Sequence, residues 1–311
     1  MSTSSVYVGI DVSKEHLDLD PFDRKAARIK NSPAGIQGLA RRIRAFPEKI
    51  IVCCEATGGY EHLLVRMLCE QDIEICRVNP KCVRYFAISK GILAKTDSID
   101  AGVISAFGTS HRPRSVQPLP AWILPVRELL SRRHDLIEMR KQEQSRLDTL
   151  HSPQVRQMAE AHVVCIKSQI AAAEETMHEL IRSEPQLHLN YIRLCEVKSL
   201  GFITALSLLA FVPELGTLSG NQAAALVGVA PYNNESGTKS GQRFIKGGRP
   251  KARNPLYMAS VSAIRYNPVL SEFYNRLVEK GKPKKKAITA VMRKLVVLAN
   301  RLLADPDFQL S

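Results

Sequence analysis

A β-strand pattern near the N-terminus, followed by alternating helix and strand patterns, limits the folds open to this chain. Apolar residues recur at every second position from Val6 to Val12 and again at Leu17 and Leu19, as on the two strands of a β-hairpin. Further strands are predicted at 28–31, 50–54 and 73–78, and helices at 33–46, 63–68, 80–88 and 97–107. This order predicts one mixed sheet flanked by helices, the layout of ribonuclease-H-like domains.

The middle of the chain is predicted to be helical. Four prolines between residues 113 and 125 mark a linker, and the segment from Val126 to Arg182 contains no glycine and has apolar residues at helical spacing. We expect an antiparallel helical hairpin or coiled coil, broken near Pro153, with Val155 and Met158 among its seam residues. Such a pair of helices either mediates self-association or packs as a spacer against its own chain, and both interpretations are open.

The last third is also predicted to be mostly helical. Helices are expected at 192–197, 202–211, 222–227, 256–263 and 286–303, and a polar loop is expected from Pro231 to Pro255. The predicted fold class is therefore α/β plus α. Its domains are a mixed-sheet domain over 1–118, a helical coiled coil or linker over 119–190, and a mostly helical C-terminal domain over 191–311.

Basic residues are concentrated in the last third of the chain. Lys and Arg total 44 against 30 Asp and Glu, and residues 191–311 alone carry 18 basic and 7 acidic side chains. Between Lys239 and Lys294, fifteen basic side chains are accompanied only by Glu272 and Glu279. This density suits a nucleic acid backbone, and a solvated basic face is the alternative.

Cysteine usage and hydropathy are typical of a protein of the reducing cytosol. The seven cysteines form no CxxC pair and no even framework, so neither disulfides nor a zinc cluster is expected. No signal-peptide pattern is present, and the longest mostly apolar stretch, around Ile203 to Val212, is too short to span a bilayer. We expect a cytoplasmic, nucleoid-associated bacterial protein that does not act on a membrane.

Four acidic residues stand where the predicted sheet would bring them together. Asp11 interrupts the apolar first strand, Glu55 directly follows the strand at 50–54, and Asp97 and Asp100 lie three residues apart on one face of a helix. In a ribonuclease-H-like sheet the first and fourth strands are neighbours, and this helix packs across their ends. Crowded carboxylates raise one another's pKa unless a cation neutralises them, and hard oxygen ligands select Mg²⁺ or Mn²⁺. Two such ions assist phosphodiester displacement.

Each of these residues also has a simpler interpretation. Asp97, which follows Thr96, fits a helix cap with Asp100 in the first helical turn. Glu55 fits a cap for the helix that follows it. Asp11 is harder to explain in this way, because acidic residues are depleted from strands and its neighbours are apolar.

Three short strings and one longer segment carry a resemblance to a known family. The strings are VGIDVSK from Val8, EATGGYE from Glu55 and AKTDSIDA from Ala94, and the longer segment runs from Val197 to Pro231. Together they resemble the DEDD-type insertion-sequence transposases of the insertion-sequence 110 family, which also includes Piv-like DNA invertases. The resemblance covers nearly the whole chain.

The resemblance implies a fold, an activity and a set of site residues. It implies a RuvC-like domain whose Asp11, Glu55, Asp97 and Asp100 are catalytic and bind Mg²⁺ or Mn²⁺, a coiled-coil middle, and a C-terminal domain with a serine nucleophile. The matching serine is Ser236. The implied enzyme is a transposase or recombinase that cuts and rejoins donor and target DNA through a phosphoserine link. A structured guide RNA from the element's noncoding end and a homodimer or tetramer are the further implied partners.

Ser236 and the competing Ser240 lie in a polar loop, and an ordinary turn is the simpler interpretation of both. No histidine follows His188, so the proton of Ser236 would have to go to a metal-bound hydroxide or to a carboxylate of the first domain. The residues expected to bind nucleic acid are Lys239, Arg243, Lys246, Arg249, Arg253, Lys284, Lys285 and Lys286.

Other functions compete with this one. A Piv-like invertase would act on chromosomal inverted sites, and a RuvC-like junction nuclease would use water and need no Ser236. A non-catalytic nucleic-acid-binding scaffold would keep the sheet only as architecture, although all four acidic positions are filled. The segment from Val197 to Ala205 resembles a phosphate-binding helix-hairpin-helix, with Ser199 where proline or glycine is usual, and simple helix packing is its alternative.

Overall fold

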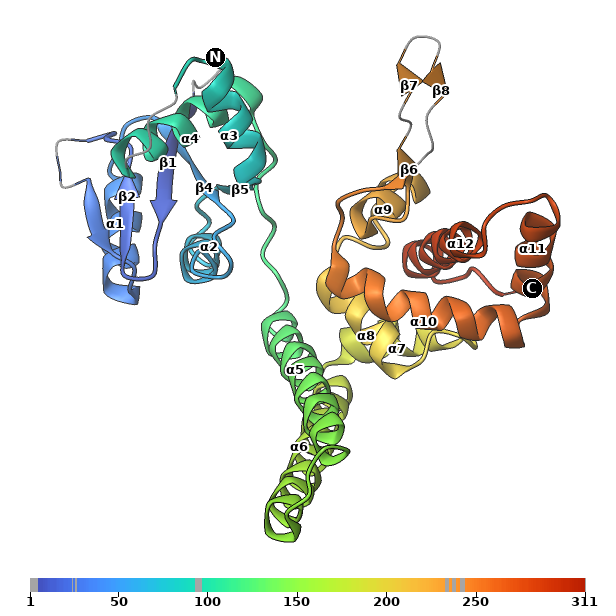
Figure 1. Ribbon diagram of the computed structural model, residues 1–311. Helices are drawn as coiled ribbons and strands as arrows, with labels where there is room; N and C mark the ends of the chain where they lie inside the picture. Colours follow the sequence, from blue (N-terminus) through green and yellow to red (C-terminus); the bar gives the residue numbers. More distant parts are fainter. Residues whose placement is uncertain are drawn as a thin grey trace. The chain divides into compact units, whose positions relative to one another are not determined.

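A computed structural model describes residues 5–23, 25, 27–92, 97–232, 235–236, 239–240 and 244–310 (Figure 1). At 97–99, 235–236 and 239–240 the description is of the backbone alone. The chain forms two compact units, residues 1–119 and residues 120–311. Each unit is described by itself below.

The first unit is built on a mixed five-stranded sheet. Its strands are β1 (Ser5–Val12), β2 (His16–Leu19), β3 (Arg28–Lys30), β4 (Lys49–Glu55) and β5 (Ile75–Val78), in the spatial order β3-β2-β1-β4-β5. β1 pairs antiparallel with β2 and parallel with β4, and β4 pairs parallel with β5. The expected mixed sheet is therefore confirmed, as is the expectation that its first and fourth strands are neighbours.

Helices cover both faces of this sheet. They are α1 (Pro33–Arg44), α2 (His62–Cys69), α3 (Pro80–Ser89) and α4 (Asp97–His111). On one face Val8 and Ile10 of β1 are buried together with Leu39 of α1 and Leu64 of α2. On the other face the residues buried together are Ile51 and Cys53 of β4, Val83 of α3, and Ile104 and Phe107 of α4.

The polar residues before Pro33 and Pro80 start α1 and α3, as expected. The Ser32 side chain accepts a hydrogen bond from the Gly35 backbone N–H, and the Asn79 side chain accepts one from Lys81. Both are N-cap interactions, which satisfy N–H groups that have no partner inside the helix. Side chains of the first unit thus fix where α1 and α3 begin.

The second unit begins with two long helices. α5 (Ile123–Leu147) and α6 (Pro153–Ser183) are joined by a short turn and bury Leu136, Ile166 and Ile170 between them (Figure 1). The predicted break near Pro153 is confirmed. The expectation that Val155 and Met158 lie in the seam is wrong, because their side chains are 45% and 73% exposed. Both stand in the first turns of α6, close to the end of α5, where few facing side chains are available to cover them.

Six further helices pack around an apolar centre. They are α7 (Pro185–Cys195), α8 (Phe202–Phe211), α9 (Gly220–Val227), α10 (Pro250–Tyr266), α11 (Pro268–Glu279) and α12 (Lys284–Ala304). Every residue of α8 from Thr204 to Ala210 is buried, so α8 lies in the middle of the unit. None of the helices in the described part of the chain is long and apolar enough to cross a bilayer.

Two sequence expectations are corrected in this unit. α10 starts at Pro250 and contains Pro255, so the polar loop ends before its predicted end at Pro255. Pro255 lies near the start of α10, so its missing N–H removes only one interior hydrogen bond of a 17-residue helix. α11 was not predicted, although the Asn267 side chain caps its N-terminus and Pro268 opens it.

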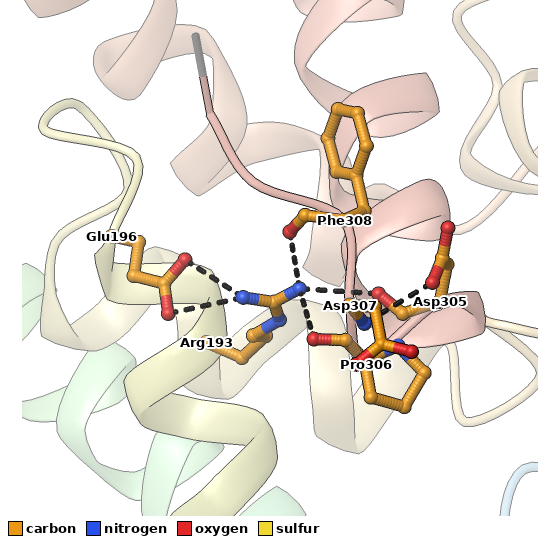
Figure 2. Close-up of polar contacts among 6 residues, drawn as sticks. All are labelled: Arg193, Glu196, Asp305, Pro306, Asp307 and Phe308. Carbon is orange, nitrogen blue, oxygen red and sulfur yellow. Dashed lines mark hydrogen bonds and ion pairs between the residues drawn. The ribbon is translucent and has the colours of Figure 1, made fainter.

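Arg193 joins the end of the chain to α7. Figure 2 shows its guanidinium between the Glu196 carboxylate, at 3.1 Å, and the backbone carbonyls that follow α12. Its Nη2 donates to the carbonyl oxygens of Asp305 at 3.1 Å, Pro306 at 2.7 Å and Phe308. These carbonyls have no partner within a helix, so Arg193 both neutralises Glu196 and holds the C-terminal segment in place.

Candidate functional site

Asp11 and Glu55 lie on adjacent parallel strands at the same level. Ile10 of β1 is paired with Cys54 of β4, so Asp11 and Glu55 are each the next residue along their strands. Because neighbouring parallel strands in register point matching residues to the same face, the two carboxylates emerge on one side of the sheet. Both side chains are partly buried.

That side of the sheet is the one covered by α4. Ser105 of α4 donates from its hydroxyl to the carbonyl oxygen of Tyr7, at 2.6 Å, and a Cβ atom at Gly9 would meet Ala101 of α4. Side chains alternate along a strand, so Tyr7, Gly9 and Asp11 share this face. On β4, Cys53 packs in the core under α3 and α4, so Glu55, two residues on, lies on the same face.

The first turn of α4 lies at the end of β1 that carries Asp11. Gly108 is close to Tyr7, and Ile104 and Ala101 are close to Gly9, so α4 runs antiparallel to β1. Asp100 is one turn before Ile104 and is partly buried. Asp97 is the first residue of α4, and its side chain lies outside the described residues.

The described side chains do not by themselves form a metal centre. Among them, no three His, Cys, Asp or Glu groups lie close enough together to hold one ion, and the Asp97 side chain is not among them. The fold thus brings Asp11 and Glu55 to neighbouring positions and the start of α4 to the same end of the sheet. The alternative interpretation of Glu55, as a cap for the next helix, is wrong, because the N-cap residue of α2 is Glu61.

A fifth acidic residue, Asp18, lies opposite Asp11, and sequence reasoning missed it. Asp11 pairs with Asp18 across β1 and β2, so both side chains are on the same face. Arg28 of β3 binds Asp18 through two hydrogen bonds, of 2.7 and 3.1 Å. The Arg28 charge offsets the repulsion between the two aspartates. The alternation of acidic and apolar residues in 17–20 was the available signal.

Glu61 is a second acidic residue whose position the sequence did not predict. Its side chain is buried, and its carboxylate accepts hydrogen bonds from the backbone N–H groups of Thr57, at 3.2 Å, and Gly59, at 2.9 Å. Arg77 and His62 lie 3.6 and 3.7 Å from its other oxygen. Burial alone would raise the pKa of Glu61, but these donors and the nearby positive charge lower it overall.

Glu61 therefore holds the loop that follows Glu55. Gly58 and Gly59 have φ values of 76° and 127°, and Glu61 ties this turn to the end of β4. The signal for Glu61 was its place in the string that begins at Glu55. Burial of Glu61 is not apparent from the sequence, because an acidic residue beside a turn is usually exposed.

Ser236 lies on a projecting segment of the second unit, which we call the serine arm and define as residues 231–245. At its base, β6 (Pro231–Tyr232) pairs with β9 (Phe244–Ile245), and further out β7 (Glu235–Ser236) pairs with β8 (Lys239–Ser240) (Figure 1). The register places Ser236 directly opposite Lys239. The side chains of Ser236, Lys239 and Ser240, and Arg243 as a whole, lie outside the described residues.

Two glycines fix the base of the serine arm. Gly228, which ends α9, and Gly248 both have positive φ, and a Cβ atom at Gly248 would lie 2.3 Å from Gly228 Cα. Arg253 donates to the carbonyl oxygens of Gly228, at 3.3 Å, and Gly247, at 2.7 Å. Arg253 was expected to bind nucleic acid, and in the structure it bonds to the backbone on both sides of the arm.

Arg249 is likewise engaged within the protein. It forms two hydrogen bonds with the Glu214 carboxylate, at 2.5 and 2.6 Å, and a third with the Phe211 carbonyl oxygen, at 2.8 Å. Burial raises the pKa of Glu214, and the bonds and charge of Arg249 outweigh this effect and lower it. By contrast, Lys246, Lys284, Lys285 and Lys286, also expected to bind nucleic acid, are exposed.

The segment that resembles a helix-hairpin-helix connects α7 and α8. α8 is preceded by Gly201, and no side chain caps its N-terminus. Ser199 is buried in this turn, and Lys198 beside it is exposed. Both phosphate binding and simple packing remain compatible with this arrangement.

Comparison with known proteins finds matches along most of the chain. Residues 8–151 match a transposase family, the DEDD transposases of the IS110 type, and residues 192–275 match the family described as Transposase IS116/IS110/IS902. The pilin gene-inverting proteins of Moraxella lacunata and Moraxella bovis are each 27% identical to the chain over 307 residues. Each alignment covers 95% of this chain and 95% of the relative.

Proposed function

Since the chain belongs to the IS110 family of transposases and is thereby a DNA transposase or recombinase, we propose that it cuts and rejoins DNA with a serine nucleophile and a divalent metal ion. The sheet unit, residues 1–118, is the metal-binding domain of this proposal. Residues 119–190 are a helical coiled coil that mediates self-association into a dimer or tetramer. Residues 191–311 carry the nucleophile and the basic surface.

The observation that supports the proposal most is the register of β1 and β4. It gives Asp11 and Glu55 neighbouring positions on the face that α4 covers, and Asp100 stands at the adjacent end of α4. The strand order matches a ribonuclease-H-like sheet, in which carboxylates at these positions serve phosphodiester chemistry.

The donor chemistry fits a hard divalent cation. We assign Asp11, Glu55, Asp97 and Asp100 as the residues that hold Mg²⁺ or Mn²⁺, because carboxylate oxygens are the ligands that these ions prefer. When bound, the ion supplies positive charge that stabilises the charge developing on the phosphate oxygens. Arg28 binds Asp18, which lies opposite Asp11, and its positive charge offsets part of the negative charge of that strand pair.

We assign Ser236 as the nucleophile. Its Oγ attacks the phosphorus, a phosphoserine bond forms, and the bond to the sugar oxygen of the cut strand breaks. The serine hydroxyl loses its proton in this step, and the sugar oxygen takes up a proton and leaves as a hydroxyl. A hydroxyl of a second strand then displaces the serine and rejoins the DNA. The pairing of Ser236 with Lys239 supports this assignment, because a cation across the hairpin is suited to a phosphate at that position.

The nucleic acid partners follow from charge. The 18 basic and 7 acidic residues of 191–311 suit donor and target DNA and a structured guide RNA. Among the expected phosphate-binding residues whose side chains the structure describes, Lys246 and Lys284–Lys286 are exposed, and they are our first candidates for direct contact.

Site-specific inversion is the second candidate function. Two relatives that match 95% of the chain are named pilin gene-inverting proteins, and inversion uses the same cutting and rejoining steps on sites within one molecule. A plasmid that carries paired sites in inverted and in direct orientation distinguishes inversion from excision and insertion.

A recombination assay with a covalent trap tests the proposal. Asp11→Asn and Ser236→Ala are expected to abolish strand exchange and to retain DNA binding, while Ser240→Ala, the matched control, recombines normally. A nicked suicide substrate should leave DNA attached to Ser236, as mass spectrometry of the adduct would reveal. Full recombination by Ser236→Ala, or a DNA adduct on Ser240, would refute the assignment of Ser236 as the nucleophile. Metal-dependent cutting of DNA without a covalent adduct would favour a nuclease that uses water. Treatment with RNase tests the dependence on guide RNA.

A further inference from the structure

Two exposed aromatic side chains stand at the base of the serine arm, and no step of the proposed chemistry uses them. Tyr232 of β6 is directly opposite Phe244 of β9. Residues directly opposite in an antiparallel pair point to the same face, with Cβ atoms about 5 Å apart. The side chains are 49% and 59% exposed, and the adjacent Ile245 is 39% exposed.

The position of this pair is fixed by the backbone beneath it. β6 follows Gly228, β9 precedes Gly248, and these glycines are in direct contact. The Arg249 N–H donates to the Leu226 carbonyl oxygen at 3.0 Å, which ties the returning strand to α9. Tyr232 and Phe244 thus stand on strands whose ends are held together by backbone contacts, which lowers the cost of ordering β6 and β9 when a ligand binds.

Lysines surround the pair. The Lys286 ammonium lies over the Phe244 ring, 5.8 Å from its centroid, and Lys284 and Lys285 precede it as exposed residues at the start of α12. Lys246 directly follows β9 and is also exposed. A ligand that presents flat apolar rings together with negative charge complements both features.

We propose that Tyr232 and Phe244 form a stacking platform for unpaired bases of a nucleic acid, with Lys246 and Lys286 contacting the neighbouring phosphates. Stacking of bases on aromatic side chains beside a basic surface is the usual way in which proteins bind single strands. In a duplex the base faces are covered by adjacent base pairs, so the platform selects unpaired nucleotides. This inference rests on the proposed function, because strand exchange leaves bases unpaired close to Ser236, on the same arm.

The experiment is a fluorescence titration of the full-length protein with oligonucleotides that contain 2-aminopurine. Stacking on an aromatic ring quenches this base analogue. We expect quenching with single-stranded DNA and with unpaired RNA, and much less with a matched duplex. Phe244→Ala and Tyr232→Ala should each weaken single-strand binding about tenfold and reduce the quenching, since one base stack contributes ~1–3 kcal/mol. Phe244→Tyr, which retains a ring, should restore both.

The matched control is Tyr266→Ala. Tyr266 is an aromatic residue of the same unit, 69% exposed at the end of α10, and its loss should leave single-strand binding unchanged. Thermal melting and circular dichroism verify folding, and the ring-retaining variant provides a second test should an alanine variant unfold.

Distinct outcomes overturn the platform and the proposed function. If Phe244→Ala and Tyr232→Ala bind single strands like the wild type, or if Tyr266→Ala is equally defective, the platform is refuted while the recombinase assignment stands. If the alanine variants change the oligomeric state in sedimentation and leave single-strand binding intact, the face is a contact between copies and the platform is again refuted. If the wild type binds no DNA or RNA of any form, the proposed function fails with it.

Discussion

Gly9 of β1 and Ala101 of α4 approach so closely that a Cβ atom at position 9 would lie 2.0 Å from the Ala101 carbonyl oxygen. The same atom would be 2.5 Å from the Ser105 backbone nitrogen, so the contact is between two backbones and no side-chain rotation can relieve it. Asp11 is two residues beyond Gly9, and Asp100 directly precedes Ala101. The close approach therefore sets how far the strand carboxylate is from the helix carboxylate.

Replacing Gly9 by alanine should separate α4 from the sheet. Because the added methyl group meets backbone atoms, we expect a loss of about 2–4 kcal/mol in the free energy of unfolding and a loss of recombination. Urea denaturation followed by circular dichroism measures the first effect. The control is Gly38→Ala in α1, where an added Cβ meets nothing within 4 Å and should stabilise the protein by ~0.5–1 kcal/mol. Equal stability of the two variants would contradict the assigned contact.

Glu61→Gln should destabilise the first unit in a pH-dependent way. The pKa of Glu61 is lower in the folded protein than in the unfolded chain, where it is about 4.3. The Glu61 carboxylate therefore stabilises the fold fully above the unfolded pKa. This stabilisation is lost as the pH falls through the lower pKa of the folded state. We expect a difference of about 2 kcal/mol at pH 7 that shrinks below pH ~4. Urea unfolding from pH 3 to 7 measures it. The control is Glu70→Gln, at the exposed residue that follows α2, which should cost less than ~0.5 kcal/mol. A pH-independent difference for Glu61→Gln would be inconsistent with a charged carboxylate.

Divalent metal should stabilise the wild type and not the Asp11→Asn variant. A ligand that binds only the folded state raises its stability by RT ln(1 + [L]/Kd), which is about 2.7 kcal/mol at a hundredfold excess over Kd. Thermal melts with and without Mg²⁺ or Mn²⁺ measure this effect. Ca²⁺ serves as a comparison ion. The control variant is Asp72→Asn, which changes an exposed residue in the turn between α2 and β5. An equal metal-induced shift in Asp11→Asn would remove Asp11 from the metal ligands.

Much of the fold follows from local sequence signals, and the parts that do not follow depend on long-range packing. The caps Ser32 and Asn79 and the alternation in β1 place their elements, because each acts on neighbouring residues. Pro255 inside α10 contradicts the local rule, since the contacts of a long helix outweigh one lost hydrogen bond.

The candidate site likewise has residues that local sequence patterns reveal and contacts that only the fold reveals. Asp11 and Glu55 are recognisable because a polar residue at the end of an apolar strand is unusual, and their adjacency follows once the strand order is known. The partnership of Arg249 with Glu214, 35 residues apart in sequence, has no local pattern. From composition alone, an arginine in a basic loop is indistinguishable from a phosphate-binding one.

Arg249 and Lys246 should therefore respond differently to substitution. Arg249→Gln removes the ion pair with Glu214 and the bond to the Phe211 carbonyl, and we expect ~1–3 kcal/mol lower stability. Lys246→Gln, at an exposed position, should leave stability within ~0.5 kcal/mol and lower the slope of log K against log salt for DNA binding by about 1. Fluorescence anisotropy at several salt concentrations gives the slope. If the Arg249→Gln protein had normal stability and a reduced slope of log K against log salt, Arg249 would be a phosphate-binding residue and not a structural one.

The adjacent glycines at the base of the serine arm provide the sharpest comparison. Gly247 and Gly248 have φ values of 70° and 75°, so alanine at either position is strained by about 1–2 kcal/mol. A Cβ at Gly247 meets nothing within 4 Å, whereas a Cβ at Gly248 would collide with the backbone of Gly228 at 2.3 Å. Gly248→Ala should thus cost about 2–5 kcal/mol and displace the arm that carries Ser236, while Gly247→Ala should cost only the strain. Unfolding curves together with recombination rates test this. If both variants lose the same stability and activity, the contact with Gly228 does not position the arm, and the collision must be relieved by a movement of the loop.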